Sequence, residues 1–315
     1  MRVLVTGGAG FIGSHLVEGL LRRGARVRVL DNLTTGKRSN LDSSWKRIEF
    51  LRGDIRDEKA LKRALRGVEV VFHQAALRSV PKSVEDPMSY HEADATATLL
   101  LLTLSRAAHV RRLIYASSSS VYGGGPVPQK ETLFPKPRSP YAAAKLSGEF
   151  YCTMFWRLFG FQAVVLRYFN VFGPRQSLES QYAVVIPKFI TSLLEKKSPP
   201  IYGDGQQTRD FTYVDNVVDA NVKAAAAPRV PGEVMNVASG GQHSVLELAE
   251  NLNQMMGLEV EPVFKPPREG DVLRSWADIG KAKRLLKYQV KVPFTEGLRR
   301  TVAWFQENPR VWHKR

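Results

Sequence analysis

A tyrosine and a lysine four residues apart are the side chains of this sequence with the clearest chemical potential. Tyr141 and Lys145 lie in the segment Ser139-Pro140-Tyr141-Ala142-Ala143-Ala144-Lys145. Proline suits the first turn of a helix, and alanine is the strongest helix former. Residues four apart on a helix share one face, so we expect the Lys145 ammonium to favour the Tyr141 phenolate and to lower the tyrosine pKa.

A phenolate in such a position can remove a proton from a hydroxyl while a cofactor removes a hydride. An unperturbed phenol titrates near ~10 and is a poor base at neutral pH, which is why the neighbouring cation matters. Tyr-x-x-x-Lys also occurs by chance on many helices, so the pair predicts chemistry only when other motifs of the same kind of site accompany it.

A glycine-rich turn near the start of the chain is one such accompanying motif. Residues 2–6 read as a short buried strand, which leads into Gly7-Gly8-Ala9-Gly10-Phe11-Ile12-Gly13 and then an amphipathic helix to about Arg23. Glycines let backbone N–H groups approach a pyrophosphate, and the helix N-terminus favours its negative charge. The order strand, turn and helix therefore predicts a dinucleotide site.

An acidic residue follows the next predicted strand, residues 26–30. Asp31 lies eighteen residues after Gly13. A carboxylate there can accept hydrogen bonds from both hydroxyls of an adenine ribose and would repel a 2′-phosphate. This placement favours NAD over NADP.

Further strands are predicted at residues 48–52, 68–73, 112–116 and 163–168, with a long apolar helix at 88–109 between two of them. Asp54 and Ile55 follow the first of these strands and would suit an adenine ring, although the segment could equally be a turn and a helix cap. Small residues follow the second, in Gln74-Ala75-Ala76. The alternation of strands and helices predicts a parallel, Rossmann-like doubly wound sheet.

Hydroxyl side chains follow the strand at 112–116, in the run Ser117-Ser118-Ser119-Ser120. Ligands in open parallel sheets bind beyond the carboxyl ends of the strands, so these serines are expected to face the site. At least two of the four are as well explained by a serine-rich turn. Beyond residue 169 the chain holds more proline, glycine and aromatic residues, and Arg209 is a candidate partner for a phosphate.

The composition excludes several classes of protein. The net charge is +16, but the cations are scattered in pairs and form no basic stripe of the kind that binds nucleic acid. No apolar segment is long enough to span a bilayer. The single cysteine, Cys152, excludes an internal disulfide and fits a cytoplasmic protein, and the six histidines show no metal-ligand spacing.

Taken together, these motifs resemble the extended short-chain dehydrogenase/reductases, in the nucleotide-sugar epimerase and dehydratase branch. The resemblance runs from Met1 to about Val292 and is strongest to the UDP-glucose and UDP-N-acetylglucosamine 4-epimerases. Typical stretches are residues 72–81 (FHQAALRSVP), 166–173 (LRYFNVFG) and 268–271 (REGD). One departure is Asp94, where the helix motif of the family usually carries Asn.

The resemblance implies roles for individual residues. Tyr141 would be the acid/base, Lys145 would bind the nicotinamide ribose, and Ser118 would contact the sugar. Ser118 is chosen because it lies four residues before Tyr122, as the Ser or Thr of the family does, and Ser119 is the alternative. The implied NAD-binding residues are Gly7, Gly10, Phe11, Ile12, Gly13, Asp31, Asn32, Asp54, Ile55, Gln74, Ala75, Ala76, Arg78, Tyr141, Lys145 and Tyr168. The implied substrate-binding residues are Arg78, Ser118, Ser119, Tyr141, Asn170, Val185, Ile201, Tyr202, Arg209, Arg268, Asp271 and Ser275.

Two positions narrow the implied reaction. Dehydratases and decarboxylases of this branch have acidic residues directly after the catalytic Ser or Thr, where this chain has Ser119 and Ser120. Glucose-restricted epimerases tend to have a bulky Tyr at the position of Ser275. The small serine of this chain would leave room for an N-acetyl group, unless Trp276 fills the space. The implied function is 4-epimerisation of UDP-GlcNAc, and of UDP-Glc in galactose metabolism, through a 4-keto intermediate with tightly bound NAD and no metal.

Alternatives stay open at this stage. They are a uronic-acid 4-epimerase, which an extra cation near the sugar C6 would favour, a C5 epimerase, and a non-catalytic NAD-binding relative. We expect an NAD-binding domain at residues 1–169, with 208–238 packing back on it, and a substrate domain at 170–207 and 239–315. The apolar helices at 88–109 and 140–159 resemble those that pair in homodimers of the family.

Overall fold

A seven-stranded parallel sheet forms the centre of the computed structural model, which describes residues 1–178, 185–267 and 272–312. The strands lie in the order β11-β6-β5-β4-β1-β2-β3. They are β1 (Arg2–Thr6), β2 (Arg26–Asp31), β3 (Ile48–Arg52), β4 (Val70–His73), β5 (Arg112–Ser118), β6 (Gln162–Tyr168) and β11 (Val234–Val237). Strand order reverses between β1 and β4, as in a doubly wound nucleotide-binding sheet. The predicted fold class is confirmed, and β11 adds a strand that the sequence pattern did not indicate.

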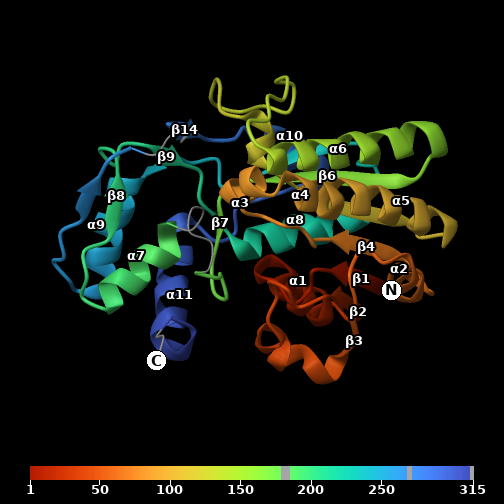
Figure 1. Cartoon of the computed structure of the whole chain (residues 1–315), viewed down its shortest axis with the longest axis horizontal. Helices are drawn as coiled ribbons and strands as arrows, with labels where there is room; N and C mark the ends of the chain where they lie inside the picture. The colour runs from red at the N-terminus through yellow and green to blue at the C-terminus, as the bar shows by residue number, and fades with distance from the viewer. Residues whose placement is uncertain (179–184, 268–271, 313–315) are drawn as a thin grey trace.

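Helices cover both faces of this sheet (Figure 1). One apolar cluster packs α1 (Phe11–Arg22) and α8 (Val214–Ala226) on one face, and a second packs α2 (Glu58–Leu65), α5 (Ala97–Ala107) and α6 (Pro140–Phe159) on the other. The sheet strands are buried on both sides, which explains their near-continuous apolar sequences. Helix α8 packs against α1, although α1 ends at Arg22 and α8 begins only at Val214.

Short strands and three helices build the other half of the molecule, on the left in Figure 1. Its helices are α7 (Val185–Leu194), α9 (Val245–Met256) and α11 (Phe294–Glu307), which share a third apolar cluster. Its strands pair in small sheets: β7 (Val171–Phe172) with β10 (Thr212–Tyr213), β8 (Pro200–Tyr202) with β13 (Val263–Lys265), and β9 (Thr208–Arg209) with β12 (His243–Ser244) and β14 (Arg274–Ser275).

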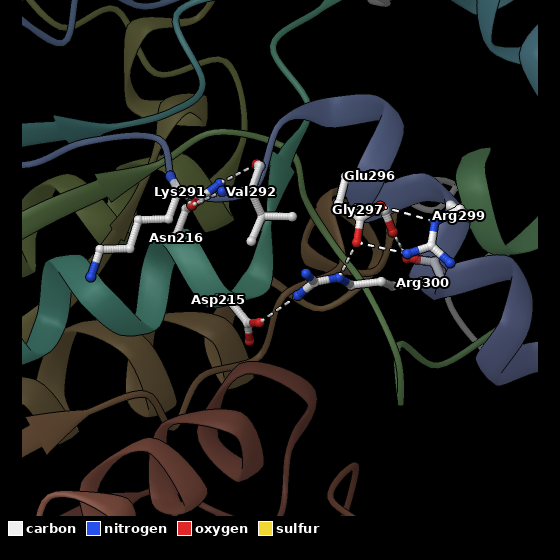
Figure 2. Close-up of polar contacts among 9 residues, drawn as sticks. Asp215, Asn216, Lys291, Val292, Glu296, Gly297, Arg299 and Arg300 are labelled. Carbon is white, nitrogen blue, oxygen red and sulfur yellow. Dashed lines mark hydrogen bonds and ion pairs between the residues drawn. The ribbon is translucent and has the colours of Figure 1, made fainter.

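The two halves meet where the first turn of α8 lies against the segment that enters α11 (Figure 2). The Asn216 amide donates to the Val292 carbonyl at 2.8 Å and accepts from the Lys291 N–H at 2.9 Å. Arg300 of α11 reaches Asp215 at 3.7 Å and Glu296 at 2.6 Å. Buried side-chain to backbone bonds of this kind fix how the halves sit together.

The long apolar helix expected at 88–109 is present but not uniform. α4 (Pro87–Tyr90) leads into a π-helical turn, His91–Thr96, and then into α5. Tyr213 precedes α8, and Asp215 lies in the first turn of that helix. Val185 and Pro187 lie in the first turn of α7.

One part of the expected division also differs. The segment from Ala277 to Tyr288, with helix α10 (Gly280–Leu286), packs into the first cluster beside β11 and α8, although the sequence assigned it to the substrate part. Its buried apolar side chains complete the sheet edge that β11 forms. The remaining helical elements are η1 (Arg38–Arg47), α3 (Val80–Glu85), η3 (Ser119–Tyr122) and η4 (Pro309–Val311). Among the described residues, no helix combines the length and the apolar character needed to cross a membrane.

Candidate active site

The glycine turn after β1 is shaped by close backbone contacts. Gly7 has a φ of +67°, and a Cβ there would lie 2.6 Å from the Ala75 Cα. A Cβ on Gly13 would lie 2.1 Å from the Gly7 carbonyl oxygen. The glycines therefore allow the turn, the start of α1 and the end of β4 to pack together, which no larger residue permits.

The N-terminus of helix α1 is open to a ligand. Gly10 precedes the helix without a side-chain cap, and the first intrahelical bond runs from the Ser14 N–H to the Gly10 carbonyl at 3.0 Å. The N–H groups of the first turn can therefore serve an anion. The Phe11 side chain packs into the third apolar cluster, so of this predicted residue only the backbone can contribute.

Asp31 is the last residue of β2 and is buried beside the glycine turn. Its carboxylate accepts from the Ala9 N–H at 2.9 Å and from the Leu33 N–H at 2.8 Å. Burial raises the pKa of Asp31, against the effect of these two hydrogen bonds. A carboxylate has about four acceptor positions, so two are left for ribose hydroxyls.

Asp54, a predicted cofactor-binding residue, already has hydrogen-bond partners within the chain. Its two oxygens accept from the Arg56 side chain and backbone and from the Asn32 amide, at 2.8 to 2.9 Å. The Arg56 hydrogen bonds are the largest cause that holds the pKa of Asp54 far below its usual range. All four acceptor positions are taken, so an adenine amino group would have to displace one of these donors. Asp57 caps helix α2, and Ile55 is buried in the second cluster.

A hydrogen-bonded trio closes the site between β4, β6 and α8. Gln74 contacts the Tyr168 hydroxyl at 3.1 Å and Asn221 at 3.3 Å, and the Asn221 amide donates to Tyr168 at 2.8 Å. Burial raises the pKa of Tyr168 to about 12, so it stays a neutral phenol. Ala75 and Ala76 follow Gln74 at the edge of the sheet, where their small side chains leave space.

These features fit a dinucleotide. The Cβ-free cradle, the uncapped helix and the Asp31 carboxylate lie at the carboxyl ends of adjacent strands, since Thr6 pairs with both Leu30 and His73. The turn would hold the pyrophosphate of NAD and Asp31 its adenine ribose. No group of three or more His, Cys, Asp or Glu among the described residues is arranged to hold a metal ion.

Tyr141 and Lys145 both lie on α6, which Ser139 caps through a 3.2 Å bond to the Ala142 N–H. The predicted lowering of the tyrosine pKa by the lysine is wrong for this structure. Burial is the largest effect and raises the pKa of Tyr141 to about 12, while a hydrogen bond with Ser118 and the charge of Arg78 oppose it. The Lys145 Nζ instead contacts the Ala116 carbonyl at 3.2 Å.

The serine run divides into different roles. Ser117 donates to the buried Glu149, which also forms an ion pair with Arg167 of β6 at 2.6 Å. Ser118 ends β5, caps η3 and forms a side-chain hydrogen bond with Tyr141. Ser119 and Ser120 face a large cleft instead.

That cleft has a volume of about 1110 Å³ and lies between the two halves. Six of the predicted substrate residues line it: Ser119, Asn170, Val185, Tyr202, Arg209 and Ser275. Ile201 does not, because it is fully buried in the third cluster. Successive residues of a strand point to opposite faces, so Pro200 and Tyr202 line the cleft while Ile201 packs behind it.

Asn170 follows β6 with a φ of +32°, in a backbone region that Asn tolerates better than most residues. Its amide donates to the Asp210 carbonyl at 3.5 Å. Ser275 pairs in register with Arg209, so the two side chains belong to the same part of the cleft wall. The predicted residues Arg268 and Asp271 lie outside the described residues.

Two cations of the cleft wall were missed at the sequence level, Arg138 and Lys188. Arg138 lies three residues before Tyr141, so its place was open to inference once the helix start had been predicted. Lys188 lies on the first turn of α7, in a segment that was not expected to be helical.

Comparisons with known proteins agree with this arrangement. The model of the NAD dependent epimerase/dehydratase family matches residues 3–238. A UDP-glucose 4-epimerase of Mycolicibacterium smegmatis is 40% identical over 97% of this chain and 99% of its own length. The UDP-glucose 4-epimerase of Thermotoga maritima, solved with UDP-glucose, superposes with a TM-score of 0.93 at 40% identity and covers 98% of this chain and 100% of its own. The UDP-N-acetylglucosamine 4-epimerase of Methanobrevibacter ruminantium, solved with UDP-N-acetylmuramic acid, has the same TM-score, 0.93, and identity, 40%, over 98% of both chains.

Proposed function

The chain belongs to the NAD dependent epimerase/dehydratase family, within the extended short-chain dehydrogenase/reductases, and on this premise we propose that it is a UDP-hexose 4-epimerase that interconverts UDP-GlcNAc with UDP-GalNAc and UDP-Glc with UDP-Gal. The observation that carries the proposal is the hydrogen bond between Tyr141 and Ser118, with Lys145 on the same helix as Tyr141. Ser119 and Ser139, the chain neighbours of this site, line the cleft of about 1110 Å³, a volume that suits a small-molecule ligand. The enzyme is an isomerase with NAD as its cofactor.

NAD, when bound, supplies the reversible uptake of a hydride at the sugar C4. Tyr141 removes the proton of the 4-hydroxyl and later returns it, while the Ser118 hydroxyl shares the hydrogen bond to the same oxygen. Because burial keeps the tyrosine protonated, the Ser118 bond and the nearby Arg78 charge are needed to make the phenol a usable base. Lys145 would hold the nicotinamide ribose, and Arg209 the diphosphate.

The cleft favours simple epimerisation over elimination of water. Ser119 and Ser120 occupy the wall next to Ser118, and Glu85 is the one acidic side chain among the described residues of the lining. Glu85 is exposed at the end of α3, whereas elimination needs a general acid beside the sugar.

Acceptance of an N-acetyl group rests on Ser275. This small side chain lines the cleft, whereas the bulky Trp276 next to it does not. We propose that the sugar C2 faces this point of the wall, where a small side chain would leave room for an N-acetyl group.

A uronic-acid 4-epimerase is the second candidate, because Arg138 and Lys188 bring cations to the cleft in addition to Arg209. A carboxylate at the sugar C6 would find a partner there if one of them faces it.

We also propose a homodimer formed through α6. Phe150, Met154 and Leu158 repeat every four residues on this helix and are 63%, 38% and 66% exposed. A helix stripe of this kind is usually covered, and α5 beside it supplies the second helix of a pair. Sedimentation of the Phe150→Glu and Leu158→Glu variants tests this: both should be monomers if the stripe is the contact.

We propose a cofactor part of residues 1–169 with 214–238 and 277–288, and a substrate part made of the rest. Residues 208–213, which the sequence assigned to the cofactor part, hold β9 and β10 and pair with strands of the substrate part. The third apolar cluster, which centres on α7, α9 and α11, supports a separate core for the substrate part.

The deciding experiment is proton NMR of the purified protein with UDP-GlcNAc, UDP-Glc and UDP-glucuronate in separate tubes, without added NAD. Galacto-configured anomeric signals from the first two would support the proposal and a retained cofactor. Turnover of UDP-glucuronate alone would replace it with the second candidate. No turnover of any of the three, with NAD supplied, would overturn it.

A further inference from the structure

Asp94 is a buried carboxylate that the mechanism above leaves unused. It lies in the π-helical turn His91–Thr96 and is 1% exposed. Its Oδ1 accepts from the Leu77 N–H at 2.8 Å, and its Oδ2 has no hydrogen-bond partner among the described residues. Buried polar atoms normally have partners, so an exception calls for an explanation.

Lys145 acts on this carboxylate through its charge, although no hydrogen bond or ion pair joins the two among the described residues. Lys145 as a whole residue is 3% exposed, and the Ala116 carbonyl that its Nζ contacts is neutral. Glu149 is on the same helix, but its charge is matched by Arg167 at 2.6 Å. Among the anionic groups that favour the charged lysine, Asp94 has the largest effect. A buried cation needs such a counter-charge to stay protonated.

A second link joins Asp94 to Tyr141. Asp94 and Tyr90 together hold the loop that carries Arg78: Asp94 binds the Leu77 N–H, and the Tyr90 hydroxyl accepts from the Ser79 N–H at 3.1 Å. The Tyr90 ring also meets the Tyr141 ring edge-on, with centroids 6.4 Å apart. The same helical segment thus positions the Arg78 loop and contacts the acid/base.

We propose that Asp94 is a positioning residue of the catalytic centre: its buried carboxylate holds the Arg78 loop next to Tyr141 and supplies a negative charge on the side of Lys145. The inference rests on the proposed role of Tyr141 as acid/base. An asparagine at position 94 would keep the hydrogen bond to the Leu77 N–H but would carry no charge. The negative charge of the carboxylate is therefore the property that distinguishes this chain from relatives with Asn there.

The carboxylate acts in a crowded setting. The titratable or charged groups that interact with Asp94, Lys145 or Tyr141 come from every neighbouring element: Arg78, Tyr90, Tyr115, Glu149, Cys152 and His73. His73 is neutral, since burial and Lys145 lower its pKa to about 3, and burial raises the pKa of Tyr115 and of Cys152. Asp94 is therefore the member of the group that changes charge near neutral pH.

Burial raises the pKa of Asp94 to about 6, against the pull of Lys145 and the Leu77 bond. Above that pH the carboxylate is ionised, raises the proton affinity of Tyr141 and supports the charge of Lys145. Below it both effects disappear. Turnover should therefore show an inflection near pH 6 that belongs to Asp94.

The first test needs no activity. The protein is labelled with ¹³C at the aspartate carboxyls, and the Asp94 signal is assigned by its loss in Asp94→Asn or through its connection to the backbone. This signal should titrate near pH 6. Lys145→Met removes the opposing cation and should raise the midpoint by about half a pH unit or more. The control Lys82→Met, at an exposed lysine of α3, should leave it unchanged. A midpoint that does not respond to Lys145→Met overturns the inference.

The second test is the pH dependence of kcat. Asp94→Asn should remove the inflection near pH 6 and move the acid limb to lower pH, because Tyr141 loses a neighbouring anion. Asp86→Asn, the same change at an exposed helix cap, should keep the wild-type profile. A uniform loss of kcat at every pH in Asp94→Asn would show a merely structural role and overturn the proposal. If the protein turns over no UDP-hexose, the proposed function fails, and the NMR titration still decides this inference. If Asp94→Asn does not fold, the comparison of the Asp94 titration midpoint in wild type and in Lys145→Met decides it.

Discussion

The cofactor side and the substrate cleft are built in contrasting ways. The cofactor side lies on strands of four to seven residues whose ends are aligned by parallel register, and its contacts are largely backbone N–H groups and one carboxylate. The cleft is bounded by strands of two or three residues, β7, β8, β9 and β14, and its wall is made of side chains from segments far apart in the chain.

This difference teaches where each property of the enzyme resides. The cofactor side depends on space, since a single Cβ at Gly7 or Gly13 would collide with backbone. The cleft depends on which side chains face inward, as Tyr202 and Ile201 on one strand illustrate. Substitutions should therefore separate chemistry, stability, cofactor binding and substrate choice, in that order of size.

The largest effect is expected from Tyr141→Phe, which removes the acid/base and leaves both halves in place. Turnover of the best substrate should fall by about 10²–10⁴-fold. Bound NAD and the midpoint of thermal unfolding should not change. Tyr151→Phe, ten residues later on the same helix, is the control and should keep wild-type turnover. Turnover of Tyr141→Phe above a tenth of wild type would mean that another group moves the proton.

Arg167→Met should mainly destabilise the cofactor side. Arg167 and Glu149 pair at 2.6 Å with both side chains buried, so the substitution leaves a carboxylate without its counter-ion. The free energy of unfolding should fall by about 3–5 kcal/mol, measured by denaturant titration. The double variant Arg167→Met/Glu149→Gln should recover at least half of the loss. Equal losses in the single and double variants would contradict an ionic origin.

Gly13→Ala should weaken cofactor binding without removing a single polar group. Its Cβ would lie 2.1 Å from the Gly7 carbonyl oxygen, so the turn must move. Overpacking of this kind costs about 1–3 kcal/mol, which corresponds to a loss in NAD affinity of roughly tenfold to a hundredfold by calorimetry. Gly241→Ala is the control, since the nearest atom to its Cβ is 3.8 Å away. Unchanged affinity in Gly13→Ala would place the pyrophosphate elsewhere.

Ser275→Tyr should have the smallest effect and only on the cleft. The larger side chain would fill the space beside the sugar, and turnover of UDP-GlcNAc should fall by about tenfold relative to UDP-Glc. The ratio of the two rates is the measurement, so UDP-Glc serves as the internal control. An unchanged ratio would refute the steric argument.

The catalytic pair shows how the two kinds of inference differ. The spacing of Tyr141 and Lys145 correctly gave a shared helix, capped by Ser139. The electrostatics did not follow from spacing, because burial outweighs every neighbouring charge at Tyr141 and Lys145 turns to the Ala116 carbonyl. The surroundings of Asp54 did not follow from spacing either: the Arg56 side chain, two residues on, donates to both of its oxygens.

The sequence by itself determined the parallel sheet, the glycine turn, the acid at the end of β2 and the helix that carries Tyr141, because each depends on residues close together in the chain and on repeating patterns of apolar side chains. Only the tertiary structure decided which serine meets Tyr141, that Ile201 is buried, that β11 and α10 complete the sheet, and that Asp94 lies near Lys145. Those outcomes depend on burial and on contacts between distant segments, and neither is set until the whole chain has packed.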